Sequence, residues 1–264
     1  MEVTYIRADP AGNITLLVTS PVPAEDRAKI SGALLAMPEL DAEQVGFVVP
    51  PQLGGDARVE MMGGEFCGNA LRAAALYTAR QTGAADGTVL KMEISGAKEP
   101  LEVRVHTGSG EVTAQIPFPR SVEEETVCGL PMGVVVFDGI VHGVLESDRP
   151  DEAQARTVTR ALLEQYPVGA AGLMYLSWKG GEYRVEPFVY VAATDTMFHE
   201  RSCASGSAAV ACYLSDEQIA GIFTYALHQQ GGLLKATTVL EECACLSVSV
   251  SGPVILGESC TATV

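Results

Sequence analysis

Short apolar runs alternate along the first part of the chain with longer stretches whose apolar residues fall on one helical face. A short run predicts a strand, and a helical period that stops at a glycine predicts a helix that ends there. The most distinctive helix follows a glycine-rich turn at 61–69 and ends before Gly83. In chain order we expect a strand at 14–18, a helix at 23–37, a strand at 45–49, a helix at 70–80, and strands at 89–94, 101–106 and 112–116, the last two joined by a turn at 107–110.

The second part of the chain repeats this order of elements after a break. The stretch 117–131 is bounded by prolines and carries consecutive glutamates, so we expect a linker there. Beyond it we expect strands at 134–137 and 141–145, a helix at 151–166, strands at 173–178 and 183–191, and a helix of small residues after a serine- and glycine-rich turn. The fold class that follows is α+β, with one lobe at 1–118 and a second at 119–264.

Two helix starts superpose when the chain is slid over itself by 136 residues (203 − 67 = 136). Residues 66–77 then lie over residues 202–213. Each segment places a cysteine, Cys67 or Cys203, ahead of small residues and an alanine-rich helix, with a tyrosine further along. The match indicates two related halves, each with a cysteine at the start of a helix.

Charge and composition exclude several classes of protein. Of the 264 residues 47% are hydrophobic and 19% charged, which is typical of a globular protein and not of a disordered chain. Lysine and arginine (17) against aspartate and glutamate (33) give a net charge of −16. Such a chain repels phosphate backbones and anionic lipid surfaces, so we expect neither nucleic acid nor membrane as a partner. Because no apolar run approaches ~18 residues and no signal peptide is evident, we expect a cytoplasmic protein.

The seven cysteines do not form the pattern of a disulfide framework, since their number is odd and their spacing irregular. One close pair, Cys243 and Cys245, lies in an alternating, strand-like stretch. It lacks the second pair of cysteine or histidine residues that a zinc site needs. We therefore expect no metal, and we expect the cysteines at the two helix starts to be the ones with a chemical role.

A cysteine at the start of a helix lies beside backbone N–H groups without helical partners and at the positive end of the helix dipole. Both features favour the thiolate and are expected to lower the pKa of the thiol from ~8.5. The same N–H groups form a cradle for a carboxylate. If two such cysteines face each other, one removes a proton from one face of a carbon and the other returns a proton to the opposite face. The pattern predicts inversion of an amino acid at Cα, with no cofactor.

Other roles for the two cysteines stay open from the residues alone. Cys67 and Cys203 are small enough to serve only the packing of each helix on its sheet. A disulfide between them would act as a redox switch. A non-catalytic amino-acid-binding protein would keep the carboxylate cradles and need neither thiol. Retention of racemisation after substitution of either cysteine would favour these alternatives.

The two cysteine motifs, residues 67–72 and 202–207, resemble those of the diaminopimelate epimerase and proline racemase superfamily, whose members racemise amino acids without pyridoxal phosphate. The resemblance implies two pseudo-symmetric lobes of diaminopimelate epimerase-like fold, an active site in the cleft between them, and Cys67 and Cys203 as the acid/base pair. It allows the last strand to return to the first lobe. It implies that the substrate is held by Asn13, Gly68, Asn69, Ala204 and Ser205.

The distal part of the predicted pocket differs from diaminopimelate epimerase. Residues 139–142 read Gly-Ile-Val-His where that enzyme has Gly-Asn-Pro-His, so Ile140 cannot hydrogen-bond a second amino-acid group. Glu186 stands where diaminopimelate epimerase has an asparagine ahead of a strand, and Glu200 lies close before Cys203; both residues are similar to the histidine racemase branch of the superfamily. A glutamate suits an imidazole N–H. We therefore expect histidine as the substrate, diaminopimelate as the alternative, and Glu186, His142 and Glu200 among the substrate-binding residues. The oligomeric state is open, with a homodimer as one alternative.

Overall fold

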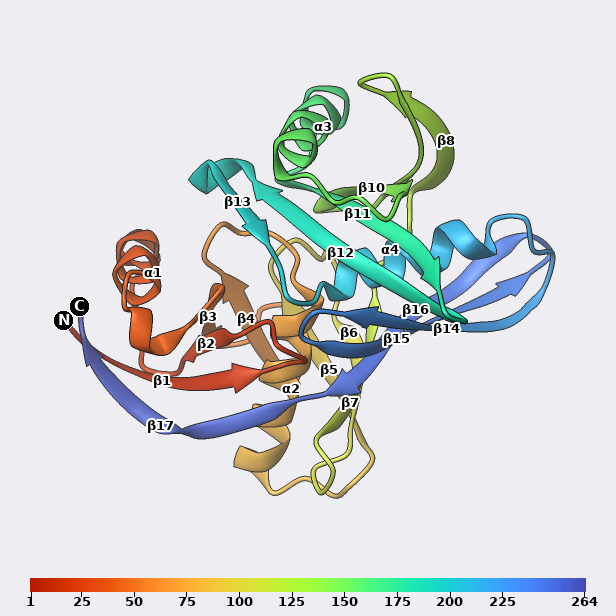
Figure 1. The fold of residues 1–264 in the computed structure, drawn as a ribbon. Coiled ribbons are helices and arrows are strands. Elements are labelled where there is room, and N and C mark those ends of the chain that lie inside the picture. The colour runs from red at the N-terminus through yellow and green to blue at the C-terminus, as the bar shows by residue number, and fades with distance from the viewer. The chain divides into compact units, whose positions relative to one another are not determined.

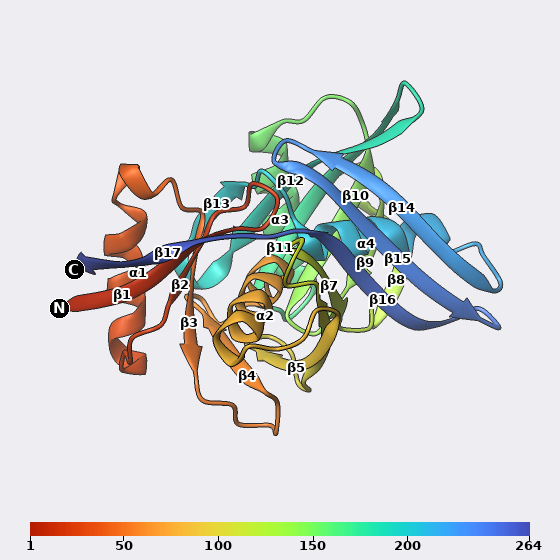
Figure 2. The same ribbon diagram turned by 90° about the horizontal axis from the view of Figure 1, so that it is seen from below.

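The computed structural model describes residues 1–264, except for the side chain of Thr194. The chain divides into two compact units (Figures 1 and 2). Unit 1 contains residues 1–114 together with 251–264, and unit 2 contains residues 115–250. No helix among the described residues is long and apolar enough to cross a membrane.

Strands from opposite ends of the chain pair with each other in the sheet of unit 1. β1 (Glu2–Asp9) pairs antiparallel with β17 (Ile255–Thr263), so the two chain ends lie side by side (Figure 1). From β1 the ladder continues in chain order through antiparallel and parallel pairs. Its further strands are β2 (Thr15–Val18), β3 (Gln44–Val49), β4 (Ala57–Met61), β5 (Thr88–Ile94), β6 (Leu101–Val105) and β7 (Glu111–Ile116).

Two α-helices belong to unit 1. A 3₁₀ turn (Ala24–Asp26) leads into α1 (Arg27–Leu35), which is followed by a second 3₁₀ turn (Pro38–Leu40). α1 buries Ile30 and Leu34 against apolar residues of β1, β2 and β3. α2 (Gly68–Thr82) packs against β2, β4, β5, β6 and β17, and most of its residues are buried, which explains its run of alanines. It ends where Gly83 adopts a left-handed conformation, φ 65°, as the sequence predicts.

Unit 2 also consists of strands and two α-helices. Its strands are β8 (Ser121–Val127), β9 (Leu130–Val136), β10 (Ile140–Glu146), β11 (Ala170–Lys179), β12 (Glu182–Val191), β13 (Thr196–His199), β14 (Gly221–Gln229), β15 (Gly232–Glu241) and β16 (Ala244–Pro253). α3 (Glu152–Gln165) begins after Asp151, whose carboxylate accepts the Gln154 N–H at 2.8 Å. It covers β10, β11 and β12. α4 (Ala204–Ser215) contacts β9, β10, β11, β14 and β15.

The prediction of a linker at 117–131 is wrong. β8 and β9 form an antiparallel hairpin across residues 121–136, and the turn places Cys128 and Gly129 at φ 53° and 80°. Two residues with positive φ are what a tight hairpin needs, but cysteine is seldom found in that conformation. The acidic run lies on β8, where Glu123 and Glu124 are exposed. The consecutive glutamates therefore belong to a solvent-exposed part of a strand and not to a linker.

Candidate active site

Cys67 is the residue that caps the N-terminus of α2. Its backbone is extended (φ −134°, ψ 106°), and its Sγ accepts the N–H of Ala70 at 3.4 Å. The segment ahead of it is fixed by Gly96, whose φ is +75° and whose added Cβ would lie 2.4 Å from the backbone nitrogen of Phe66. Because glycine alone permits that approach, the turn after β5 holds the backbone that leads into Cys67.

A chain of buried amides connects Cys67 to Asn13. The Cys67 thiol donates to Oε1 of Gln44 at 2.7 Å, and Nε2 of Gln44 donates to Oδ1 of Asn13 at 2.7 Å. Nδ2 of Asn13 donates in turn to Glu43 at 2.7 Å. The structure thus brings two predicted site residues into one network, within unit 1. Gln44 was not predicted; its signal is a polar residue directly before the apolar strand at 45–49.

Cys203 begins α4 in the same way that Cys67 begins α2. Its backbone has φ −129° and ψ 112°, and its Sγ accepts the N–H of Gly206 at 3.3 Å. Its own N–H donates to Oε1 of Gln229 on β14 at 2.8 Å, and Nε2 of Gln229 donates to Ser207 at 2.9 Å. Gln229 was not predicted, because the sequence does not show which residue of β14 faces the start of α4.

His142 and Ser205 form a hydrogen-bonded line to Cys203. Nε2 of His142 lies 3.0 Å from Oγ of Ser205, which lies 3.5 Å from Sγ of Cys203. Complete burial lowers the pKa of His142 to about 3, so its imidazole is neutral at physiological pH. Gly172 makes room for the ring, since a Cβ there would lie 2.3 Å from Nδ1 of His142. These three predicted site residues therefore lie together in unit 2.

The pKa of the Cys203 thiol is opposite in direction to the one expected from its place at a helix start. Burial raises it well above its ordinary value, and the charge of Glu200 and a hydrogen bond with Glu200 raise it further. The hydrogen bonds from Ser205 and from the Gly206 N–H lower it and do not compensate. Cys203 is therefore a protonated thiol with the carboxylate of Glu200 beside it.

Glu186 lies on β12, with Oε2 at 3.0 Å from Nε2 of His199 on β13. The His199 ring stacks on Phe188 at 4.3 Å between ring centroids. The side chain of Glu186 is 40% exposed. Glu200 follows β13, is buried, and donates its backbone N–H to Pro187 beside Glu186. Glu200 therefore lies next to β12, close to Glu186. Of the two glutamates, only Glu200 contacts Cys203 through its side chain.

The remaining site residues are the first residues of the two helices. Gly68 and Asn69 open α2, and Ala204 and Ser205 open α4. The first N–H groups of a helix have no carbonyl partner within the helix. All four residues are buried, and a carboxylate at either helix start would meet donors that water does not screen.

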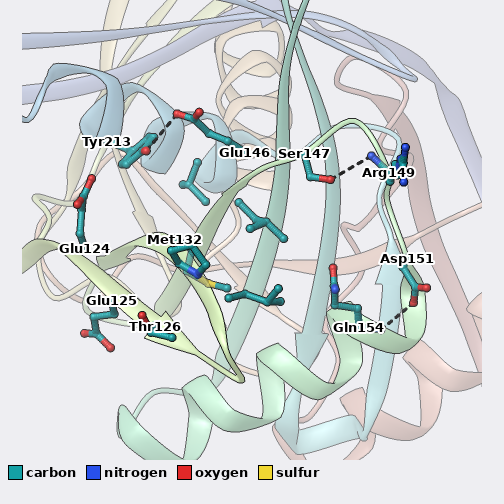
Figure 3. Close-up of a pocket in the computed structure, with 14 residues that line it drawn as sticks. Glu124, Glu125, Thr126, Met132, Glu146, Ser147, Arg149, Asp151, Gln154 and Tyr213 are labelled. Atoms are coloured by element: carbon teal, nitrogen blue, oxygen red, sulfur yellow. Dashed lines mark hydrogen bonds between the residues drawn. The ribbon is translucent and has the colours of Figure 1, made fainter.

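A large cavity of about 880 Å³ lies elsewhere in unit 2 (Figure 3). Four of its lining residues are acidic, among them Glu124 on β8 and Glu146 on β10. Oε1 of Glu146 accepts the hydroxyl of Tyr213, another lining residue, at 3.1 Å. None of the predicted site residues lines it. Across the described residues, no group of three or more His, Cys, Asp or Glu side chains is arranged to hold a metal ion.

The chain is similar over almost its whole length to a family of known proteins. The family model described as "Histidine racemase CntK N-terminal domain" matches residues 2–262. The chain belongs to the histidine racemase family. A histidine racemase of Fusobacterium nucleatum is 32% identical over 219 residues, which cover 80% of this chain and 80% of the relative. A histidine racemase of Staphylococcus aureus is 24% identical over 250 residues, covering 89% of this chain and 88% of the relative.

Membership of the histidine racemase family makes the chain an isomerase, and an amino acid racemase in particular. Its fold is similar to that of a probable proline racemase from Agrobacterium radiobacter, with a TM-score of 0.66, 12% identity, and coverage of 99% of this chain and 92% of that chain. The resemblance seen in the cysteine motifs is thereby confirmed at the level of the family and of a mixed α/β isomerase fold. The pseudo-symmetry of the halves and the roles of the site residues stay predictions.

Proposed function

We propose that the chain is a histidine racemase that inverts Cα without a cofactor, with Cys67 and Cys203 as its acid/base pair. The observation that supports this best is the equivalence of the two helix starts. Both cysteines are extended N-cap residues, and both sulfurs accept the N–H of the residue three positions on. If the cysteines served only packing, there would be no need for both sulfurs to make the same hydrogen bond at a helix start. Each sulfur also lies beside backbone N–H donors that suit a carboxylate.

The proposed reaction moves two protons and needs no other reactant. The Cys67 thiolate takes the Cα proton, and the electron pair of the broken C–H bond is delocalised into the substrate carboxylate. The Cys203 thiol gives its proton to the opposite face of Cα. The products are the other enantiomer, a Cys67 thiol and a Cys203 thiolate. Backbone N–H groups at Gly68, Asn69, Ala204 and Ser205, together with Asn13, would hold the carboxylate as its negative charge grows.

The surroundings of Cys203 support its role as the acid toward one enantiomer. Its raised pKa keeps the thiol protonated until substrate is bound. His142 is neutral, so the hydrogen bonds from His142 to Ser205 and from Ser205 to Cys203 bring no positive charge near the thiol. In the reverse direction the roles of the two cysteines exchange, and Glu200 is placed to favour return of the proton to Cys203.

Histidine is the proposed substrate because both relatives described above are histidine racemases and because the chain offers polar groups that suit an imidazole. Glu186 accepts an imidazole N–H within the protein, that of His199. A substrate imidazole is the same chemical group, so the carboxylate is suited to it. Ile140 is fully apolar and offers no partner to a second amino-acid group.

The proposal is tested by deuterium uptake at Cα in D₂O, measured across the common amino acids and diaminopimelate. Histidine should exchange and invert. Cys67→Ser and Cys203→Ser should each lower racemisation by at least ~10², because a serine hydroxyl is a far weaker base than a thiolate. The matched control is Cys260→Ser on β17, an exposed cysteine that should leave the rate unchanged. Near wild-type racemisation in either active-site variant would overturn the two-cysteine mechanism, and exchange of diaminopimelate without histidine would overturn the substrate.

A further inference from the structure

Arg72 is a fully buried guanidinium in the second turn of α2. Its Nη1 donates to Oδ1 of Asn69 at 3.1 Å, and its Nη2 donates to the backbone carbonyl of Pro253 at 2.9 Å. Asn69 and Arg72 are three residues apart and so share one face of the helix. The side chain thus runs back toward the helix start, where Cys67 stands.

The charge of Arg72 has no ion-pair partner. Both of its acceptors are neutral oxygens, Nε has no hydrogen-bond partner among the described residues, and no carboxylate of those residues lies within ion-pair distance. Burial lowers the pKa of Arg72 to about 10, while the charges of Glu111 and then Cys67 raise it. The group therefore remains a cation at neutral pH. A buried cation without an ion pair is costly, and that cost falls when an anion forms nearby.

Other charged groups on the strands around α2 are already engaged. Glu93 on β5 accepts three backbone N–H groups and contacts Arg58. Glu60 on β4 pairs with Arg27 and Arg58. Glu65, just ahead of Cys67, accepts the Gly63 N–H, and burial raises its pKa. Glu111 on β7 is half-buried and acts on Arg72 only at a distance.

We propose that Arg72 is a positioning residue that supplies the countercharge for the Cys67 thiolate and fixes the amide of Asn69 by its carbonyl oxygen. The inference rests on the proposed function for the role of Cys67 as a base. It extends that function by assigning the stabilisation of the base to a buried side chain as well as to the helix start. The cation is placed in advance, so no reorganisation is needed when the proton arrives or leaves.

The test measures the thiolate itself and needs no substrate. Alkylation of Cys67 by iodoacetamide is followed against pH in the full-length protein, with the Cys67 peptide resolved from the other cysteines by mass spectrometry. The variants are Arg72→Met, Arg72→Lys and Glu111→Gln. The control is Arg80→Met, which removes the same charge from the exposed part of the same helix. Circular dichroism shows whether each variant is folded.

Arg72→Met should raise the apparent pKa of Cys67 by about one unit and slow its alkylation at neutral pH about tenfold. Arg72→Lys should restore most of the rate, because it keeps the charge. Glu111→Gln should speed alkylation, because the carboxylate that competes for Arg72 is gone. Arg80→Met should have no effect.

A folded Arg72→Met protein that is alkylated at the wild-type rate would overturn the proposal, as would equal slowing by methionine and lysine. If Arg72→Met does not fold, Glu111→Gln decides, and an unchanged or slower rate overturns the proposal. Racemisation of histidine is measured in parallel. If the wild-type protein racemises no amino acid, the proposed function is wrong. The alkylation rates still test the role of Arg72 in that case.

Discussion

At the scale of single residues, Cys203 shows two opposed effects at one helix start. The helix dipole favours a thiolate by ~0.3 to 1 kcal/mol, whereas taking an ion out of water costs several kcal/mol. Burial and the neighbouring charge of Glu200 therefore determine the direction of its pKa. The sequence predicted the helix start, because small residues follow each cysteine. It could not predict the burial, which depends on the strands packed against α4, or the contact with Glu200, whose backbone is held by the carbonyl of Pro187 on β12.

Substitution of Glu186 tests whether its carboxylate selects an imidazole. Glu186→Gln should lower kcat/KM for histidine about tenfold, a loss of ~1.4 kcal/mol in transition-state binding, because the amide is a weaker acceptor of an imidazole N–H. Cα exchange of a small amino acid such as alanine, if detectable, should change little. Glu182→Gln on the same strand, where the carboxylate pairs with Arg184, is the control. Equal losses for both amino acids would remove Glu186 from the specificity pocket.

At the scale of elements, the sequence predicted the helices better than the strands. α2, α3 and α4 each have a capping residue and a run of helix formers, and these signals are local. β1, β4, β14 and β15 were missed, whereas for β16 and β17 the sequence indicated only an alternating stretch at Cys243 and Cys245 and a last strand without bounds. Strand formation depends on the neighbouring strands and on burial, which the local sequence does not determine. For the same reason the networks of Gln44 and Gln229 were missed: each joins a strand to a helix start far away in the sequence.

The turn after β5 provides a test of how the start of α2 is held. Gly96→Ala should destabilise the protein by about 2 to 3 kcal/mol, because alanine is strained at positive φ and its Cβ would collide with the Phe66 backbone. Urea unfolding measures the change. Gly32→Ala in α1, where nothing lies within 4 Å of the added Cβ, is the control and should be neutral or stabilising. If the urea midpoint of Gly96→Ala equals that of the wild type, the turn accommodates the added Cβ without loss of stability.

At the scale of the whole molecule, a net charge of −16 opposes compaction, so buried carboxylates must be held by donors. Glu93 is the clearest case. Its burial raises its pKa, but the N–H groups of Gln52, Gly55 and Leu53 and the guanidinium of Arg58 outweigh that effect and lower the pKa to about 2. The Glu93 carboxylate holds the backbone of residues 52–55 through these hydrogen bonds. No sequence motif marks this contact, so it was not predicted.

The pH dependence of stability should therefore contain a contribution from Glu93. Its pKa is 4.5 when unfolded and about 2 when folded, so its contribution is complete above pH 4.5 and is lost as the pH falls toward 2. The stability difference between wild type and Glu93→Gln, measured by urea unfolding, should be largest at neutral pH and should shrink through that range. Glu99→Gln, an exposed carboxylate after the same strand, should show no such trend. A difference independent of pH would mean that Glu93 acts through its shape alone.

The pairing of β1 with β17 has a consequence for biosynthesis. Unit 2 is one continuous stretch of the chain, so residues 115–250 are all synthesised before residues 251–264. In unit 1, by contrast, β1 is synthesised before unit 2, and its partner β17 is synthesised after unit 2. Until then the outer edge of β1 lacks its partner and is open to pairing with other chains. A released chain that is truncated before β17 should therefore keep a protease-resistant unit 2, whereas its unit 1 should be cleaved more readily than in the full chain.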